Sequence, residues 1–337
     1  MRRSILFTKL NTAELIEEES QSLDVNQVRV KIERTAISAG TERANLMGDT
    51  NTSIYAPKSE VAIFPRRVGY SASGIVAEVG DSVTRVKVGD RVALSWSCHS
   101  TECVVNETRV YKLPDGVSFE AAALVHIATF PAAAIRKTRL EFGESALVMG
   151  LGILGLIAVS LLRAAGACPI IAVDPVLEKR NRALELGADY ALSPYEENFA
   201  EKVKELTSGG AAVAIEVTGV GAGLNGALDC MKKFGRVALL GCTRDSDFTV
   251  DYYRKVHGPG ISLIGAHTLA RPDSESSAGM FTTLDEAEAI IKLIANGRLD
   301  FDSIVEEIRS PKEVKEVFDR LINDRSFPIL EFDWSKI

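Results

Sequence analysis

The feature that most restricts the fold of this chain is a glycine-rich segment over residues 145–175, SALVMGLGILGLIAVSLLRAAGACPIIAVDP. Gly150, Gly152 and Gly155 directly follow an apolar run of strand length and open a longer run with helical character. In a G-x-G-x-x-G turn, the first glycine permits the tight turn and the second lets the backbone approach a pyrophosphate. The third lets the helix pack closely on the strand. The segment therefore predicts a strand, turn and helix that bind a dinucleotide.

Residues around this turn predict how the dinucleotide is held. Ile153 and Leu154 begin the helix, where backbone N–H groups without helical acceptors attract the pyrophosphate. Asp174 ends the next strand, 19 residues after the third glycine, and its carboxylate is expected to accept hydrogen bonds from the adenosine ribose. A carboxylate repels a 2′-phosphate, so NAD is preferred to NADP as the cofactor. Lys179, which we also count as cofactor-binding, and Arg180 follow closely enough to weaken this preference.

Beyond the glycine-rich segment, short apolar runs alternate with longer helical runs. The expected strands are SALVMG, CPIIAVD, AVAIEVTG, GRVALLG and ISLIGAH, and the expected helices include ILGLIAVSLLRAAG, LEKRNRALELG and GLNGALDCMKKFG. This alternation is typical of a parallel, doubly wound sheet. Residues 1 to about 115 instead contain strand-like runs separated by turns. Two amphipathic helical stretches and a short strand, FPILEFDW, end the chain.

Composition excludes several classes of function. The 337 residues carry a net charge of −7 without the basic stripe that binds a phosphate backbone, so nucleic acid is not an expected partner. The start of the chain lacks a signal-peptide pattern, and no apolar window reaches the ~18 residues of a membrane span. Five scattered cysteines, an odd number, suit reduced thiols better than a disulfide framework. We therefore expect a cytoplasmic protein that does not bind a membrane.

Several stretches together carry a family pattern: AISAGTE, VGYSASGIVAEVGDSVTRVKVGDRV, KLPDGVSFEAAAL, GLGILG, VTG and LLGC. Through them the chain resembles the medium-chain dehydrogenase/reductase superfamily over nearly its whole length. Within the superfamily, the chain resembles the branch of bacteriochlorophyllide hydroxyethyl dehydrogenases and related oxidoreductases, on the basis of the stretches SAGTE and ISLIGAH. The resemblance implies an α/β protein with a GroES-like β-rich catalytic domain over residues 1–120 and a Rossmann NAD-binding domain over residues 121–283. Residues 284–337 would return to the catalytic domain, and a homodimer through the last sheet strand, or a homotetramer, is expected.

Zinc alcohol dehydrogenases of that superfamily hold their metal at positions that can be matched here. The cysteine position is Ala39, the Gly-His-Glu triplet is Gly69-Tyr70-Ser71, and the last position is best matched by His126. A catalytic zinc needs about three Cys, His, Asp or Glu ligands, and one potential ligand remains. The four-cysteine lobe of a structural zinc is also missing. The resemblance therefore implies a zinc-lacking branch, and we predict no bound metal.

A rival metal site is the segment CHSTEC, in which Cys98, His99 and Cys103, together with His126, are potential ligands. Their spacing matches no established zinc motif. Cys103 also belongs to an apolar ECVV run that is typical of a packed strand. We therefore do not expect a metal in this segment.

Four residues near the missing metal are candidates for catalysis without it. The phenol of Tyr70 can hydrogen-bond a carbonyl oxygen and transfer its proton. Thr41 matches the hydroxyl residue that relays protons in the family, and Glu42 matches an acidic neighbour that orients the network. His126 is a candidate acid, base or oxygen-polarising group. Tyr70, Thr41 and His126 also have structural interpretations, as a packed tyrosine, a turn residue and a histidine held by hydrogen bonds.

Residues at the ends of later strands are expected along the cofactor, because ligands bind at the carboxyl ends of strands in open parallel sheets. They are Thr218 in EVTG, Leu240 and Gly241 in LLG, and Gly265, Ala266 and His267 in IGAH. A long loop over residues 45–67 contains Tyr55, Arg66 and Arg67, which either shape a substrate site or belong to the solvated surface.

The function expected from these residues is that of a zinc-independent, NAD-dependent dehydrogenase that interconverts a secondary alcohol and a ketone. The small-molecule substrate is a polyol, a sugar-derived alcohol or a hydroxyethyl compound, and the sequence does not distinguish among them. One alternative is an NADPH-dependent quinone or enone reductase of the same fold, which Asp174 disfavours. Another is a dinucleotide-binding protein without catalytic activity.

Overall fold

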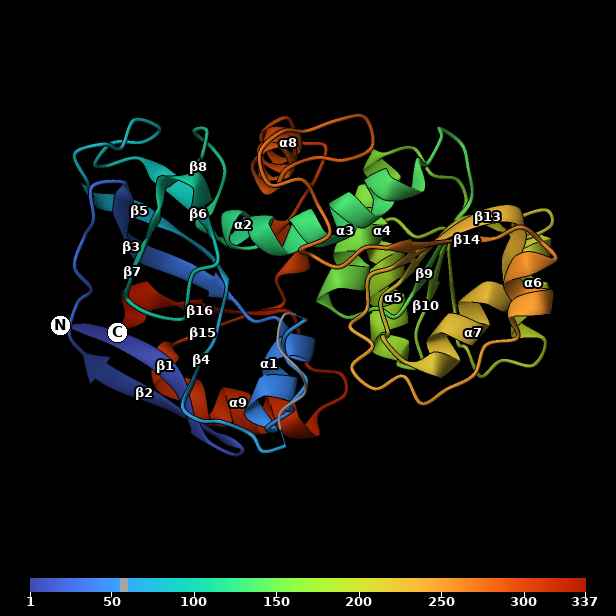
Figure 1. The fold of residues 1–337 in the computed structure, drawn as a ribbon, viewed down its shortest axis with the longest axis horizontal. Helices are drawn as coiled ribbons and strands as arrows, with labels where there is room; N and C mark the ends of the chain where they lie inside the picture. The colour runs from blue at the N-terminus through green and yellow to red at the C-terminus, as the bar shows by residue number, and fades with distance from the viewer. Residues whose placement is uncertain (55–59) are drawn as a thin grey trace. The chain divides into compact units, whose positions relative to one another are not determined.

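The computed structural model describes residues 1–54 and 60–337, which form two compact units. The first unit combines residues 1–127 with residues 287–337, so the chain leaves this unit and returns to it at its end. The second unit is the continuous stretch 128–286. Figure 1 shows strands gathered in the first unit and a sheet with flanking helices in the second. Within the described residues, no helix has both the length and the apolar character needed to cross a membrane.

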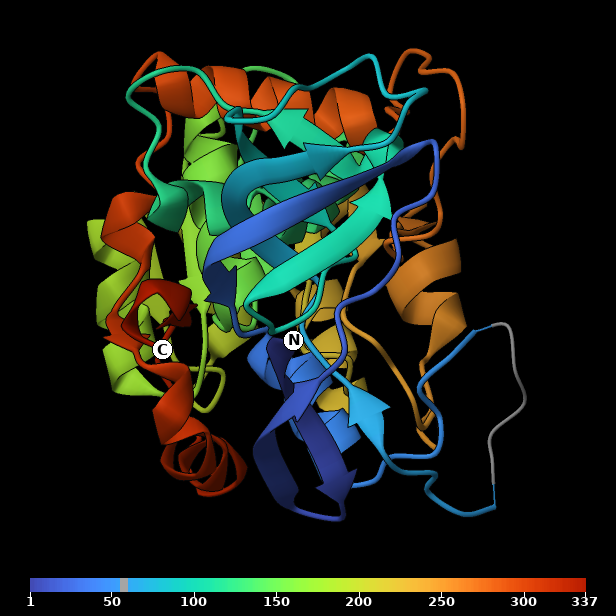
Figure 2. The ribbon, with the colours of Figure 1, turned by 90° about the vertical axis from the view of Figure 1, so that its left-hand side faces the viewer.

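Two sheets build the first unit, and their strands face the viewer in Figure 2. The smaller sheet has the order β2-β1-β4 and contains β1 (Arg2–Lys9), β2 (Thr12–Glu18) and β4 (Arg66–Arg67). The larger sheet has the order β15-β16-β3-β5-β6-β8, and β7 also pairs with β3. Its strands are β3 (Gln27–Ala36), β5 (Ser71–Val79), β6 (Arg91–Ser95), β7 (Glu102–Asn106), β8 (Val110–Lys112), β15 (Glu307–Arg309) and β16 (Leu330–Asp333).

Strand β3 illustrates how the sequence produces this β-rich unit. Val28, Val30 and Ile32 are buried, while Lys31 between them is exposed, because successive side chains of a strand point to opposite faces. The neighbouring strand β5 lies close to this backbone. A Cβ added to Gly74 would lie 2.1 Å from the Lys31 carbonyl oxygen, so the pairing of β3 with β5 requires glycine at that position.

The C-terminal tail completes the first unit. β16 pairs antiparallel with β3, which confirms the strand expected in FPILEFDW. The buried ring of Phe332 in β16 contacts the rings of Phe318 and His99. The helices of the first unit are α1 (Ala39–Leu46), α2 (Phe119–Ala123) and α9 (Val314–Asn323). Helices α3 (Val125–Thr138) and α8 (Thr283–Ala295) each contain residues of both units. Single helical turns occupy Glu107–Arg109, Tyr253–His257, Asp302–Ile304, Pro311–Glu313 and Trp334–Lys336.

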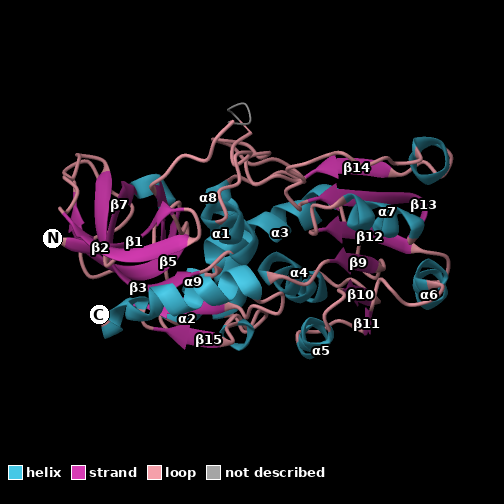
Figure 3. Cartoon of the chain, turned by 90° about the horizontal axis from the view of Figure 1, so that it is seen from below, coloured by secondary structure: helices cyan, strands magenta, loops and turns pink. Residues whose placement is uncertain are grey.

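The second unit contains a six-stranded parallel sheet with the order β11-β10-β9-β12-β13-β14. Its strands are β9 (Ala146–Met149), β10 (Ile170–Val173), β11 (Tyr190–Leu192), β12 (Ala211–Glu216), β13 (Met231–Leu239) and β14 (Ser262–Gly265). Its helices are α4 (Ile153–Ala164), α5 (Leu177–Glu185), α6 (Phe199–Leu206) and α7 (Gly221–Asp229). Figure 3 shows α4 and α5 on one face of the sheet and α6 and α7 on the other, which confirms the doubly wound fold.

One expected helix is wrong at its C-terminal end. GLNGALDCMKKFG was expected to be helical throughout, but α7 ends at Asp229 and β13 begins at Met231. Met231 is buried and pairs with Ala211 of β12, while the two lysines that follow are exposed. Sheet pairing supplies backbone hydrogen bonds and burial that outweigh the helix propensity of lysine.

Candidate functional site

The three glycines after β9 have the geometry of a dinucleotide-binding turn. Gly150 has a φ of +98°, which glycine adopts without the strain of a Cβ. A Cβ added to Gly155 would lie 1.9 Å from the Gly150 carbonyl oxygen, so the helix packs directly on the turn. A Cβ added to Gly152 would meet no atom within 4 Å, so the backbone there is open to a ligand. These positions fit the tight turn, close packing and open approach that a pyrophosphate requires.

Helix α4 presents its N-terminus at this turn. Gly152 is the N-cap residue, and the Leu156 N–H donates the first helical hydrogen bond to its carbonyl oxygen. The N–H groups of Ile153 and Leu154 precede that bond and therefore have no acceptor within the helix. Such N–H groups and the helix dipole favour an anion, so a pyrophosphate fits this end of α4.

Asp174 links the glycine turn to the end of β10. Its Oδ2 atom accepts a hydrogen bond of 2.8 Å from the Leu151 N–H, and its Oδ1 atom accepts one of 2.9 Å from the Val176 N–H. Each carboxylate oxygen has a second lone pair, so the group can still accept from ribose hydroxyls. The Arg180 guanidinium donates to the Asp174 carbonyl oxygen, whereas the Lys179 ammonium has no ion-pair partner in the part of the chain that the structure describes.

Glu216, at the end of β12, accepts hydrogen bonds from residues that follow β12 and β13. Its Oε1 atom accepts hydrogen bonds from the Thr218 and Gly219 N–H groups, and burial raises its pKa. The backbone N–H groups of Leu240 and Gly241 donate to the Glu216 carbonyl oxygen. The side chain of Thr218 also lies against the glycine turn, because a Cβ added to Gly150 would be 3.0 Å from Thr218 Cγ2. Sheet winding reverses between β9 and β12, where ligands bind in open α/β sheets.

Of the last three sequence-predicted cofactor residues, Gly265 ends β14, and Ala266 and His267 follow it. The Ala266 N–H donates to the Leu239 carbonyl oxygen, which joins this end of β14 to β13. The Lys137 ammonium donates to the Gly265 carbonyl oxygen at 3.0 Å. His267 Nδ1 accepts a hydrogen bond of 3.2 Å from the Leu269 N–H, and burial lowers the pKa of this histidine. The second unit therefore gathers the predicted cofactor residues at one edge of its sheet.

In the first unit, Tyr70, Trp96 and His126 form an aromatic cluster. The ring centroids of Trp96 and His126 are 4.9 Å apart, and those of Tyr70 and His126 are 5.8 Å apart. Both contacts are edge-to-face, a favourable geometry for aromatic rings. His126 lies in the first turn of α3 and is buried, whereas Trp96 is 38% exposed. Trp96 has a φ of +55°, an uncommon conformation for a bulky residue that costs about 1–3 kcal/mol and is often found at functional sites.

Tyr70 and His126 of this cluster stand at positions matched to zinc ligands, and the residues at the matched positions do not fit a tetrahedral zinc. Ala39 has only a methyl group, and the Ser71 hydroxyl donates to the Ala123 carbonyl oxygen. Tyr70 offers a phenol, which leaves the His126 imidazole as the one side chain of an ordinary zinc-ligand type among the matched positions. Across the described residues, no group of three or more His, Cys, Asp or Glu side chains is placed to hold a metal ion.

Glu42 belongs to a buried hydrogen-bond network that the sequence did not reveal. Its Oε2 atom lies 3.1 Å from His99 Nε2, and its Oε1 atom accepts from the Ser38 N–H. His99 Nδ1 lies 2.7 Å from the Thr35 hydroxyl, which accepts a hydrogen bond from the Trp334 indole. The arrangement that satisfies these atoms has the Thr35 proton on the bond to Nδ1 and a His99 Nε2–H that donates to Glu42.

Two other expectations can be compared with this network. Both ring nitrogens of His99 have protein partners, so the rival metal set of Cys98, His99 and Cys103 lacks its imidazole. Thr41 precedes Glu42 in α1, and the described residues provide its hydroxyl with no hydrogen-bond partner. The structure therefore groups Tyr70 with His126, and Glu42 with His99, as two separate sets of contacts.

The loop residues considered for a substrate site have structural partners. Arg66 donates to carbonyl oxygens of Ile63 and Asp49, and Arg67 makes a bidentate pair with Glu18. The hydrogen bond from Arg67 lowers the pKa of Glu18 to about 2. Tyr55 lies outside the described residues.

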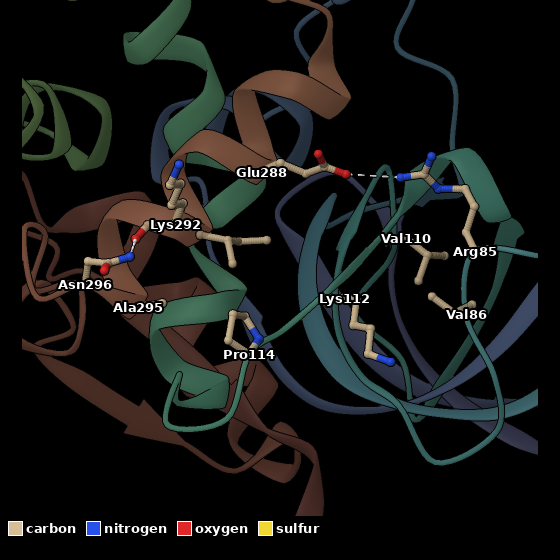
Figure 4. Close-up of a pocket in the computed structure, with 10 residues that line it drawn as sticks. Arg85, Val86, Val110, Lys112, Pro114, Glu288, Lys292, Ala295 and Asn296 are labelled. Carbon is tan, nitrogen blue, oxygen red and sulfur yellow. Dashed lines mark hydrogen bonds and ion pairs between the residues drawn. The ribbon is translucent and has the colours of Figure 1, made fainter.

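A cavity of about 680 Å³ lies elsewhere in the first unit, beside β8 and α8. Its lining is largely apolar and includes Val86, Val110 and Ile291. Figure 4 shows Arg85 and Glu288 facing one another, and they form an ion pair of 3.2 Å. None of the sequence-predicted site residues lines this cavity, so its size does not identify it as the reaction site.

Three residues of these sites were missed by the sequence reasoning: Trp96, His99 in its network, and Glu216. A lone acidic residue inside the apolar run AVAIEVTG was a usable signal for Glu216, because a buried carboxyl group needs partners. No comparable signal marks Trp96, since its left-handed backbone and its ring contacts depend on the folded chain.

Two family models match the chain. The alcohol dehydrogenase GroES-like domain matches residues 24–138, and the zinc-binding dehydrogenase family matches residues 154–286. The chain is 25% identical to D-guloside 3-dehydrogenase of Escherichia coli K12 over 91% of this chain and 92% of that protein. It is 29% identical to (R,R)-butanediol dehydrogenase of Bacillus subtilis 168 over 78% of this chain and 79% of that protein.

A solved structure shares the fold over almost the whole chain. The alcohol dehydrogenase rspB of Escherichia coli CFT073, complexed with NADH, superposes with a TM-score of 0.82. The two sequences are 19% identical, and the match covers 98% of this chain and 99% of that one. At this identity the likeness supports the two-part fold and not a shared substrate.

Proposed function

This chain belongs to the medium-chain dehydrogenase/reductase superfamily and is an oxidoreductase that acts on CH–OH groups, and we propose that it interconverts a secondary alcohol and a ketone without zinc. The observation that carries the proposal is the aromatic cluster at the matched metal positions. In support of it, Tyr70 and His126, at positions matched to metal ligands of the family, have ring centroids 5.8 Å apart and so bring a phenol and an imidazole together. A secondary alcohol is favoured because the relatives include D-guloside and (R,R)-butanediol dehydrogenases.

We propose NAD as the cofactor. A bound nicotinamide would supply the hydride acceptor for oxidation of the alcohol and the hydride donor for reduction of the ketone. The open backbone at Gly152 and the N-terminus of α4 would hold the pyrophosphate, and Asp174 would hold the adenosine ribose. Asp174 is also the basis of the preference for NAD, because its charge would repel a 2′-phosphate.

The side chains of the first unit would manage the substrate oxygen and its proton. The Tyr70 hydroxyl would donate a hydrogen bond to the ketone oxygen and take the proton back from the alcohol. The His126 imidazole, held edge-on by Trp96, would polarise the same oxygen. The Thr41 hydroxyl would relay the proton, and Glu42 would orient this segment through its bonds to Ser38 and His99.

Metal analysis combined with steady-state kinetics tests the proposal. The purified protein should contain far less than about one zinc per chain, and its oxidation of secondary alcohols should survive a chelator. Its kcat/KM should favour NAD over NADP by about tenfold or more. Stoichiometric zinc, with activity lost on chelation and restored by zinc, would overturn the zinc-free mechanism.

The same kinetic panel separates the two alternatives. Reduction of enones or quinones with NADPH, and no turnover of secondary alcohols, would identify a reductase of the same fold. Binding of NADH, with no turnover of either panel, would identify a dinucleotide-binding protein without catalytic activity.

A further inference from the structure

Cys98 and Cys103 form a thiol pair in the first unit. Cys98 lies in the connection between β6 and β7, and Cys103 is the second residue of β7. Their sulfur atoms are 3.3 Å apart, and the Ser100 hydroxyl oxygen lies 3.2 Å from the first and 3.3 Å from the second. The other three cysteines lie in the second unit, where Cys168 and Cys242 are exposed and Cys230 is buried.

The two cysteines of the pair differ in exposure and in the pKa of their thiols. Cys98 is partly exposed, whereas Cys103 is buried. The hydrogen bond between the thiols lowers the pKa of Cys98, and the positive charge of Arg2 acts in the same direction. That hydrogen bond and burial raise the pKa of Cys103. A partly exposed cysteine with a lowered pKa beside a thiol with a raised pKa is the arrangement of an oxidation-sensitive cysteine with a resolving partner.

We propose that Cys98 is a site of oxidation by hydrogen peroxide and organic hydroperoxides, and that Cys103 converts the product into a disulfide. The Cys98 thiolate attacks the terminal peroxide oxygen, the O–O bond breaks, and Cys98 becomes a sulfenic acid while hydroxide leaves, or an alkoxide when the oxidant is an organic hydroperoxide. The Cys103 sulfur then attacks Cys98, the S–O bond breaks, and the departing hydroxyl takes the Cys103 proton as water. With hydrogen peroxide, one peroxide and two thiols yield one disulfide and two waters.

The geometry favours the second step. A disulfide requires a sulfur–sulfur distance of about 2.05 Å, so the two atoms must approach by about 1.2 Å from their present separation. The chain around them is anchored on both sides. The backbone N–H of His99 donates to the Val68 carbonyl oxygen, and Cys103 pairs with Val30 of β3. Side-chain rotation therefore has to supply most of the movement that brings the two sulfur atoms together. The proposed oxidation of Cys98 does not depend on the dehydrogenase function proposed above.

Oxidation of the reduced full-length protein with one equivalent of hydrogen peroxide, followed by alkylation and peptide mass spectrometry, tests the pair. We expect a Cys98–Cys103 disulfide, with the Cys98 thiol lost about tenfold faster than those of Cys168 and Cys242, although these are more exposed. Exposed cysteines that react as fast as Cys98, or a peptide in which Cys98 and Cys103 stay unlinked, would overturn the proposal.

Two matched variants separate the roles of the sulfur atoms. In Cys103→Ser, Cys98 should still react but stop at a sulfenic acid that dimedone labels. In Cys98→Ser, Cys103 should remain reduced. Near-ultraviolet circular dichroism confirms that each variant is folded before oxidation. If the fraction of Cys103 that remains reduced after peroxide treatment were the same in the wild type and in Cys98→Ser, Cys103 would not be the resolving thiol.

Discussion

At the scale of single residues, the proposed chemistry depends on the Tyr70 hydroxyl and the His126 imidazole. Tyr70→Phe keeps the ring that contacts His126 and removes the hydroxyl that we propose bonds the substrate oxygen. We expect kcat to fall at least about tenfold, equivalent to ~1.4 kcal/mol of barrier, in Tyr70→Phe and separately in His126→Ala. Steady-state kinetics with a secondary alcohol and NAD measures the change.

The control for this prediction is Tyr195→Phe, which removes the hydroxyl of an exposed tyrosine in the second unit. NADH affinity should be unchanged in all three variants, because the expected cofactor residues are untouched. If neither Tyr70→Phe nor His126→Ala slows turnover by that factor, the acid–base assignment is wrong.

Glu331 carries a second residue-scale prediction, on stability. Its carboxyl group is fully buried without a hydrogen-bond partner among the described residues, and burial raises its pKa well above the ordinary 4.5. Glu120 and Asp302 raise it further, and Arg34 opposes them. The folded chain therefore keeps a proton that the unfolded chain releases, so this glutamate makes the fold less stable as pH rises above 4.5.

Glu331→Gln removes that titration. We expect the variant to gain stability relative to the wild type from pH 4.5 upward, by as much as about 1.4 kcal/mol per pH unit until the folded pKa is reached. Urea denaturation at several pH values measures the difference. The exposed Glu14→Gln in β2 is the control, and a Glu331→Gln difference that does not grow with pH would contradict the prediction.

At the scale of one element, the glycine turn separates a folding role from a binding role. Gly155→Ala would push a methyl group into the Gly150 carbonyl oxygen, so we expect it to unfold the second unit or to lower its stability by more than about 3 kcal/mol. Gly152→Ala meets open space and has an ordinary φ of −73°, so it should fold normally. Its methyl group would fill the approach of the pyrophosphate and weaken NADH binding about tenfold or more.

Thermal unfolding and NADH fluorescence titration distinguish these outcomes. Gly40→Ala in α1 is the matched control, because an added Cβ there also meets nothing within 4 Å and should leave NADH binding unchanged. Full NADH affinity in Gly152→Ala would show that the backbone at this position does not approach the cofactor.

At the scale of the whole molecule, the first unit is discontinuous and depends on the end of the chain. A chain that stops at residue 327 lacks β16, which pairs with β3, and loses the buried rings of Phe332 and Trp334. Loss of a buried aromatic side chain typically costs about 3–5 kcal/mol, so we expect the first unit to unfold. The second unit is continuous and should still bind NADH.

Circular dichroism and NADH titration of the truncated chain measure both effects. A chain that lacks only Lys336 and Ile337 is the control, because it keeps β16 and Trp334. Native-like melting of the chain that stops at residue 327 would mean that the tail does not complete the first unit.

The sequence by itself determined the local features of this protein, namely its strands and the glycine turn. Period-two burial in β3, the apolar strands of the second unit and the turn at Gly150, Gly152 and Gly155 depend on neighbouring residues and on backbone angles that glycine permits. The substitutions at the matched metal positions are also visible in the sequence. The lysines after α7 misled the prediction because Met231, which precedes them, pairs with Ala211 of β12 and begins the strand.

Only the tertiary structure decided which distant side chains meet. Tyr70 lies in the connection before β5 and His126 in the first turn of α3, and their contact depends on the folding of the first unit. The bond between Glu42 and His99 likewise joins α1 to the connection before β7. These contacts form because the packed core excludes other arrangements, a property of the whole unit that no short stretch of sequence contains.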